Sequence, residues 1–126
     1  MNNRADDRYN MEDFFRERAE GGDSYVELSL DAGPVRAEIK DLSVRGVGLE
    51  LANPAAGLPD LLASLEDLFI KIVIGDRMFV ANSKRAWSAV VKKGARETLA
   101  AGLRITMIAP EDSLELARII EGMRKV

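Results

Sequence analysis

The stretch Lys40-Asp41-Leu42-Ser43-Val44-Arg45-Gly46-Val47-Gly48-Leu49 decides the fold of this chain. Apolar and polar residues alternate on both sides of its centre, over 35–40 before it and 47–51 after it. Period-two alternation predicts two half-buried strands, and polar residues with glycine between them predict a tight connection. We therefore expect a hairpin, in which Gly46 turns the chain at a positive φ that a side chain would resist.

Asp41 and Ser43 in this stretch are two positions apart, so their side chains point to the same side of an extended backbone. One interpretation is that both residues cap their own turn through hydrogen bonds to the backbone. The other is that both lie on the protein surface and bind a ligand. Burial of both side chains would leave only the first interpretation.

The sequence on either side of this hairpin predicts further strands. Alternation predicts a strand from about Ser24 to Leu30. Leu68–Ile74 is apolar nearly throughout, which predicts a strand buried on most of both faces. A strand from Arg77 to about Val91 is long enough to bend or bulge, and the last strand runs from about Thr98 to Ile108. These strands and short turns predict a mainly β fold, a six-stranded antiparallel β-barrel.

Two helices are predicted around this barrel. Pro110 at the first helical position, acidic residues after it and basic residues at its end predict a C-terminal helix from Pro110 to Arg124. Its apolar residues recur at helical spacing and should lie on the barrel. They are Leu116, Ile119, Ile120 and Met123. One or two helical turns covering the core are predicted from the spacing of Leu61, Leu62, Leu65 and Leu68.

The N-terminal part, residues 1–22, is predicted to form a polar tail and a short helix ahead of the barrel domain, residues 23–126. Asn10 is a suitable N-cap for a helix over 11–20, and Gly21-Gly22 ends that run. Its apolar residues either pack against the body of the domain or form a homodimer contact. They are Met11, Phe14 and Phe15.

Composition excludes several classes of function. The 126 residues contain no cysteine and no histidine, which removes thiolate and imidazole metal sites and Ser-His triads. We therefore expect no enzyme activity, no metal and no cofactor. A net charge of −3 argues against DNA or RNA as the partner. The N-terminus does not read as a signal peptide, and no apolar run reaches the roughly 20 residues of a membrane span, so we expect a cytoplasmic protein.

Residues 41–46, Asp-Leu-Ser-Val-Arg-Gly, resemble the Asp/Asn-x-Ser-x-x-Gly signature of the PilZ domain, the bacterial receptor module for cyclic diguanylate (c-di-GMP). The stretch 101–112 is similar to that family's final strand running into its helix, and the order of elements resembles the family from about residue 18 onward. The resemblance implies a second-messenger effector or adaptor that binds this cyclic dinucleotide and acts on a protein partner. It places Asp41, Ser43 and Gly46 at the ligand.

The family's second motif, Arg-x-x-x-Arg, precedes its first strand, and its arginines hold phosphates and guanine edges. Arg4 and Arg8 have this spacing but stand further from Asp41 than the family's motif does, whereas Arg18 stands at the expected separation. Either the tail folds back to bring Arg4 and Arg8 to the ligand, or the motif has degenerated. In the second case we expect weak or undetectable binding with Arg18 alone, or a module that binds no nucleotide and acts by protein-protein contact.

Overall fold

The computed structural model describes residues 9–10 and 24–124, and within them the sheet is formed by one short strand and six long ones. The short strand is β1, Tyr9–Asn10. The long strands are β2 (Ser24–Leu30), β3 (Gly33–Ser43), β4 (Gly46–Ala52), β5 (Asp67–Ile74), β6 (Arg77–Lys93) and β7 (Arg96–Ile108). The predicted N-terminal helix over 11–20 lies outside the described residues.

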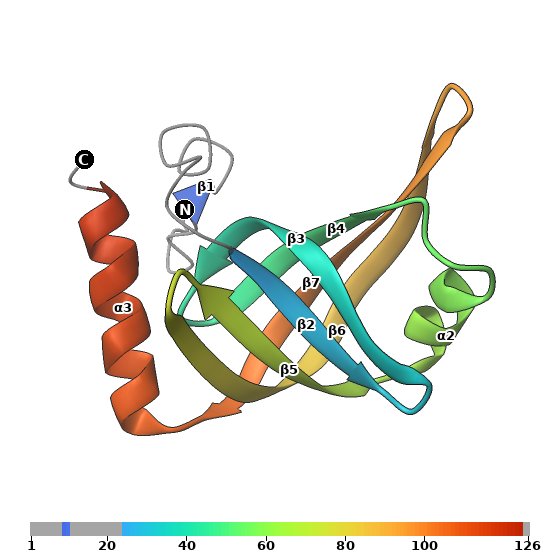
Figure 1. Cartoon of the computed structure of the whole chain (residues 1–126). Helices are drawn as coiled ribbons and strands as arrows, with labels where there is room; N and C mark the ends of the chain where they lie inside the picture. The colour runs from blue at the N-terminus through green and yellow to red at the C-terminus, as the bar shows by residue number, and fades with distance from the viewer. Residues whose placement is uncertain (1–8, 11–23, 125–126) are drawn as a thin grey trace.

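All pairings between these strands are antiparallel, in the order β1-β3-β2-β5-β6-β7-β4. An additional pairing joins β4, at one end of this order, to β3, the second strand from the other end, and closes the six long strands into a barrel (Figure 1). The six-stranded antiparallel barrel predicted from the sequence is thereby confirmed. β1 pairs with Asp41 and Leu42 near the end of β3.

Alternate residues of the six long strands fill the barrel, as the period-two pattern predicts. The largest fully buried strand residues are Val26, Leu28, Ile39, Leu42, Leu49, Ile70, Ile72, Leu99 and Leu103. Together with residues of two helices they form one continuous core. Because hydrogen bonds close the barrel, the barrel has a single interior, and this core fills it.

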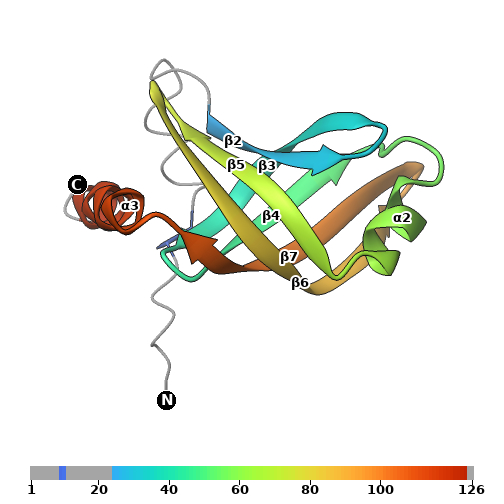
Figure 2. The ribbon, with the colours of Figure 1, turned by 90° about the horizontal axis from the view of Figure 1, so that it is seen from below.

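The two helices cover opposite ends of the barrel (Figures 1 and 2). The C-terminal helix α3, Pro110–Arg124, buries Leu116, Ile120 and Met123, and Ile119 packs partly buried against the core. The helix α2, Leu58–Ser64, buries Leu58 and Leu62 at the other end. Both helices were predicted, although α2 ends before Leu65 and Leu68 belongs to β5. Neither of these two described helices has the length and apolar character needed to cross a membrane.

The predicted burial of β5 on both faces is wrong. Leu68 and Ile70 are buried, whereas Phe69 between them is 44% exposed. The reason is that the outward face of β5 has no covering layer among the described residues, although Phe69 and Val73 on that face are also apolar. The prediction that the fifth long strand bends or bulges is confirmed, because the β6–β7 register shifts between Asn82 and Ser83 and again between Arg85 and Trp87.

Candidate ligand-binding site

The β3–β4 connection is held by the side chain of Ser43. Its hydroxyl oxygen accepts hydrogen bonds from the backbone N–H groups of Arg45 (3.0 Å) and Gly46 (3.2 Å). Ser43 is only 2% exposed, so the expectation of a surface position is wrong for this residue. The cause is local, since the hydroxyl satisfies two turn amides that would otherwise lack partners. Asp41 remains half-buried, and the ligand interpretation therefore survives for it.

Gly46 is needed for close approach between strands, and the predicted positive φ is wrong. Positive φ values occur at four other described glycines, including Gly33 and Gly94 at hairpin turns. A Cβ atom on Gly46 would lie 2.6 Å from the backbone carbonyl oxygen of Leu103 in β7. The next backbone hydrogen bond, from Ile105 N–H to the Arg45 carbonyl oxygen at 2.7 Å, fixes the turn against β7. The motif is therefore tied to a strand more than fifty residues away.

Gly48 makes room for the carboxylate of Asp41. The two residues face each other across β3 and β4, just after a register irregularity between Ile39 and Asp41. A Cβ atom on Gly48 would lie 2.7 and 2.8 Å from the two carboxylate oxygens of Asp41. The carboxylate thus leans over β4 on the outside of the barrel instead of extending straight away from β3.

Gly102 makes room for the indole of Trp87 in the same manner. The two residues are paired across β7 and β6, and a Cβ on Gly102 would lie closer than 3.0 Å to the indole atoms Nε1, Cδ1 and Cε2. Trp87 is nevertheless 47% exposed, so its ring lies over the strand with much of its surface in solvent. Glycine inside a strand commonly marks such a close approach.

Gly48 also pairs with Gly102, so the two arrangements join into one line across four strands. We call this line the outer row; it consists of Asp41, Gly48, Gly102 and Trp87. Since the carboxylate lies over β4 and the indole over the neighbouring β7, the two groups stand over strands about 5 Å apart. The outer row therefore presents the carboxylate of Asp41, a hydrogen-bond acceptor, beside the exposed aromatic face of Trp87. The backbone of Gly48 and Gly102 lies beneath these two groups.

Two arginines stand beside the outer row. Arg104 lies two residues after Gly102 and pairs with Gly46, which places it on the same outward face of β7. Arg45 is at the tip of the β3–β4 turn, and both arginine side chains are exposed. Guanidinium groups beside an acceptor and a ring suit a planar, anionic ligand.

The N-terminal strand brings the start of the chain to the same place. β1 pairs with β3 so that Asn10 stands opposite Asp41 and Tyr9 opposite Leu42. The predicted ligand residues Arg4, Arg8 and Arg18 lie outside the described residues. The structure thus joins Asp41, Ser43 and Gly46 at one turn, but it does not place the three N-terminal arginines.

Sequence reasoning missed the outer-row partners of Asp41. These are Gly48, Gly102 and Trp87, with Arg104 beside them. A signal was present, because Gly102 interrupts an apolar run inside a predicted strand. The pairing that brings it under Trp87 depends on strand register, which the run itself does not reveal.

No family model matches the sequence, and no curated protein sequence matches it significantly. Solved structures supply the comparison instead. The PilZ domain of YcgR from Escherichia coli, solved with c-di-GMP, has a TM-score of 0.58 and 21% identity, with 81% of this chain and 82% of that chain covered. The MotI/DgrA inhibitor of motility from Bacillus subtilis has a TM-score of 0.68 and 14% identity, with 98% and 52% covered. The PlzA protein of Borreliella burgdorferi, in complex with c-di-GMP, has a TM-score of 0.57 and 15% identity, with 80% and 45% covered.

These likenesses define the class of the barrel. The chain has the PilZ-like fold that the sequence motif indicated. It spans about half the length of the MotI/DgrA and PlzA chains and most of the YcgR domain.

Proposed function

We propose that this chain is a receptor for c-di-GMP that binds the nucleotide over the outer row and passes the signal to a protein partner. The proposal rests on one observation. The carboxylate of Asp41 and the exposed indole of Trp87 lie over two neighbouring strands, each above a glycine of that strand. Two proteins of similar fold were solved with c-di-GMP, which supports the choice of ligand.

The chemistry of guanine suits the two groups of the outer row. A guanine base stacked on the exposed face of Trp87 gains roughly 1–3 kcal/mol from stacking. The N–H groups on the Watson–Crick edge of the base lie in the plane of the ring and point outward from that edge, where the carboxylate of Asp41 over the next strand can accept from them. A carboxylate that accepts from these donors selects guanine over adenine, whose corresponding edge lacks the exocyclic N2 donor.

The phosphates require cations, and the surroundings of the outer row offer several. Arg104 and Arg45 stand on the described surface beside it. Arg8 immediately precedes Tyr9, whose strand pairs with β3 at the motif, and this supports recruitment of Arg8 and Arg4 from the tail. Arg18 is the remaining candidate. Ser43 and Gly46 contribute by shaping the turn that presents Arg45 and its backbone.

A module that binds no nucleotide and acts by protein contact is the second candidate. One observation favours it: the Ser43 hydroxyl already accepts two backbone hydrogen bonds, so its oxygen is committed to the turn.

Calorimetric titration of the full chain with c-di-GMP separates the two candidates. We expect saturable binding, with Asp41→Asn weakening it about 10- to 150-fold because a charged hydrogen-bond acceptor is lost. Glu97→Gln, an exposed carboxylate change near the tip of the β6–β7 hairpin, is the matched control and should leave the affinity unchanged. Absence of binding to the folded full chain would refute the receptor proposal and leave the second candidate, and equal affinity for cyclic diadenylate would refute the role of Asp41.

A further inference from the structure

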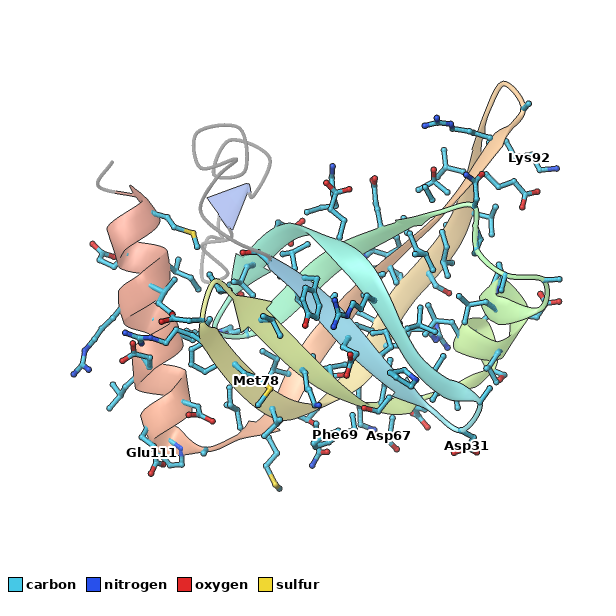
Figure 3. All side chains as sticks on the ribbon, in the orientation of Figure 1. Asp31, Asp67, Phe69, Met78, Lys92 and Glu111 are labelled. Carbon is cyan, nitrogen blue, oxygen red and sulfur yellow. The ribbon has the colours of Figure 1, made fainter. Side chains whose placement is uncertain are left out.

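A second surface of the barrel is apolar and lies on the outward faces of β5, β6 and β7. We call it the apolar patch; it consists of Phe69, Met78, Val80 and Met107, which are 44, 57, 40 and 67% exposed. Phe69 pairs with Asn82, which in turn pairs with Met107, so both side chains lie on one face. Val80 and Met78 continue that face along β6 in steps of two. Phe69 and Met78 project from this side of the barrel in Figure 3.

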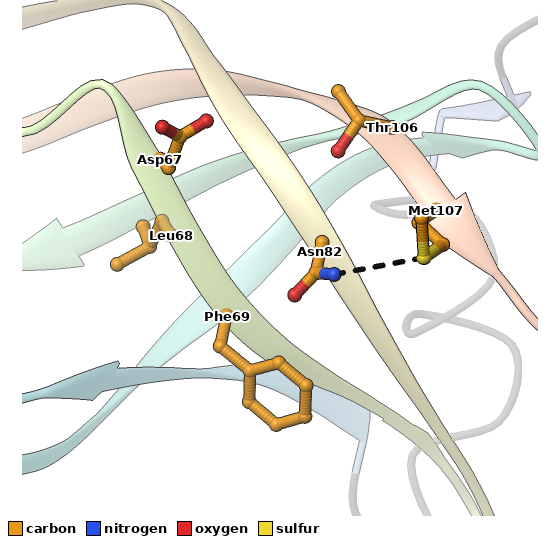
Figure 4. A pocket seen from close by; sticks show the side chains of 6 residues that line it. All are labelled: Asp67, Leu68, Phe69, Asn82, Thr106 and Met107. Atoms are coloured by element: carbon orange, nitrogen blue, oxygen red, sulfur yellow. Dashed lines mark hydrogen bonds between the residues drawn. The ribbon is translucent and has the colours of Figure 1, made fainter.

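The surface around Phe69 is hollowed on both sides. One hollow of about 400 Å³ is lined by Phe69, Asn82, Thr106 and Met107 together with Asp67 and Leu68 (Figure 4). A smaller hollow of about 170 Å³ lies toward α2, where Leu61 and Leu65 line it. Asp67, Leu68 and Phe69 line both hollows, so Phe69 stands between them, and we call the two hollows together the furrow.

The rim of the furrow is acidic. Asp31 lines the smaller hollow, Asp67 lines both, and Glu66 precedes Asp67 at the start of β5. Among the described residues two cations stand at this rim: Lys84 lies 3.7 Å from Glu66 and 3.8 Å from Asp67, and Arg85 donates from Nε to the Leu65 carbonyl oxygen at 3.0 Å. The side chains of Glu66 and Asp67 are 78% and 77% exposed, so they remain available to a further cation. Three carboxylates, Asp31, Glu66 and Asp67, thus stand against two cations, which leaves the rim with an excess of one negative charge.

The pairing of the strands means that a partner can bind to the apolar patch only through side-chain contacts. β5 pairs with β2 and β6, and over the patch β6 pairs with β5 and β7, so neither strand offers a free edge there to a partner strand. A second copy of this chain would bring acidic rim against acidic rim, and an anionic membrane surface would be repelled in the same way. A cationic helix with one apolar face meets all of these conditions.

We propose that the apolar patch is a docking site for a basic amphipathic helix of a partner protein. Apolar side chains of that helix fill the hollows beside Phe69, and the flexible Met78 and Met107 adapt to them. Lysine or arginine residues on the flanks of the helix pair with Asp31 and Asp67. This surface is separate from the outer row, and docking on it does not depend on nucleotide binding.

The probe is a synthetic helix of about 18 residues with leucine on one face and lysine on the other, titrated into the isotopically labelled full chain. We expect amide shifts centred on Phe69, Val80 and Met107. Phe69→Thr and Met107→Thr should each weaken binding about tenfold or more, and Asp67→Asn should weaken it severalfold with a shallower salt dependence. Val91→Thr, an equally exposed apolar position on the β6–β7 hairpin, is the matched control and should bind like the unchanged chain.

A peptide with glutamate in place of lysine is the control for charge and should not bind. Equal binding of the two peptides, shifts centred on another surface, or undiminished affinity of both Thr variants would each overturn the proposal. Sedimentation of the chain alone shows whether it is a monomer or a dimer. A dimer that Phe69→Thr converts to monomer would assign the patch to a second copy of this chain and overturn the partner helix.

Discussion

Gly46→Ala tests whether the PilZ-like motif is anchored to the neighbouring strand β7 by close backbone approach. The new Cβ would lie 2.6 Å from the carbonyl oxygen of Leu103, whereas ordinary contact begins at 3.4 Å. The strands must therefore separate by up to 0.8 Å at this point (3.4 − 2.6). Leu103 cannot rotate away, because its strand is paired with β4 on one side and β6 on the other.

The expected change in the free energy of unfolding is the difference between two opposing terms. Overpacking of this kind costs about 1–3 kcal/mol, and replacing glycine restricts the unfolded chain, which returns about 0.4–1 kcal/mol. We expect Gly46→Ala to lower the free energy of unfolding by a net of about 1–2 kcal/mol. For a domain of this size that corresponds to a fall in Tm of roughly 3–12 °C.

The assay is urea denaturation followed by circular dichroism, with Gly122→Ala as the matched control. Gly122 lies in α3, and a Cβ atom added to it would have nothing within 4 Å, so alanine there should raise stability by about 0.5–1 kcal/mol. The same chemical change should thus act with opposite sign at the two sites. A Gly46→Ala chain as stable as the unchanged chain would refute the close-approach explanation.

Three further predictions concern the core, the turn and the tail. Leu116→Ala, at a fully buried position of α3, should lower the free energy of unfolding by about 2–5 kcal/mol in the same assay, and a loss below about 1 kcal/mol would mean that α3 is not part of the core. Ser43→Ala removes the acceptor of two turn amides and should cost about 1–2 kcal/mol; an unchanged urea midpoint would show that those hydrogen bonds contribute nothing. A chain that starts at Asn10 lacks Arg4 and Arg8, and calorimetry should find its c-di-GMP affinity lowered at least about fivefold; unchanged affinity would leave the phosphates to other arginines.

Much of the fold was predictable because the barrel has one buried interior. Alternation along Ser24–Leu30 and around the β3–β4 hairpin reports directly which side chains face that interior. The C-terminal helix was equally clear, since Pro110 and the stripe through Leu116 mark its start and its buried face. β5 was misread because Phe69 on its outward face is as apolar as its inward neighbours, so local composition conceals the exposed side.

The candidate site was predictable only in its local part. Asp41, Ser43 and Gly46 are close in sequence, and their turn follows from their side chains. The outer row depends on pairing between strands, and no short-range pattern specifies that Gly48 meets Gly102 or that Trp87 lies over it. The two glycines have the same physical explanation, room for a side chain from the next strand, which becomes visible only when the register is known.

The indole N–H resonance of Trp87 gives the most direct test of nucleotide binding over the outer row. The chain contains a single tryptophan, so this signal is assigned without ambiguity in a spectrum of the full chain. Guanine stacked on the indole should shift the resonance progressively and saturably as c-di-GMP is added, and Asp41→Asn should move the midpoint to about 10- to 150-fold higher nucleotide concentration. An indole resonance that stays in place while calorimetry reports bound c-di-GMP would contradict the account.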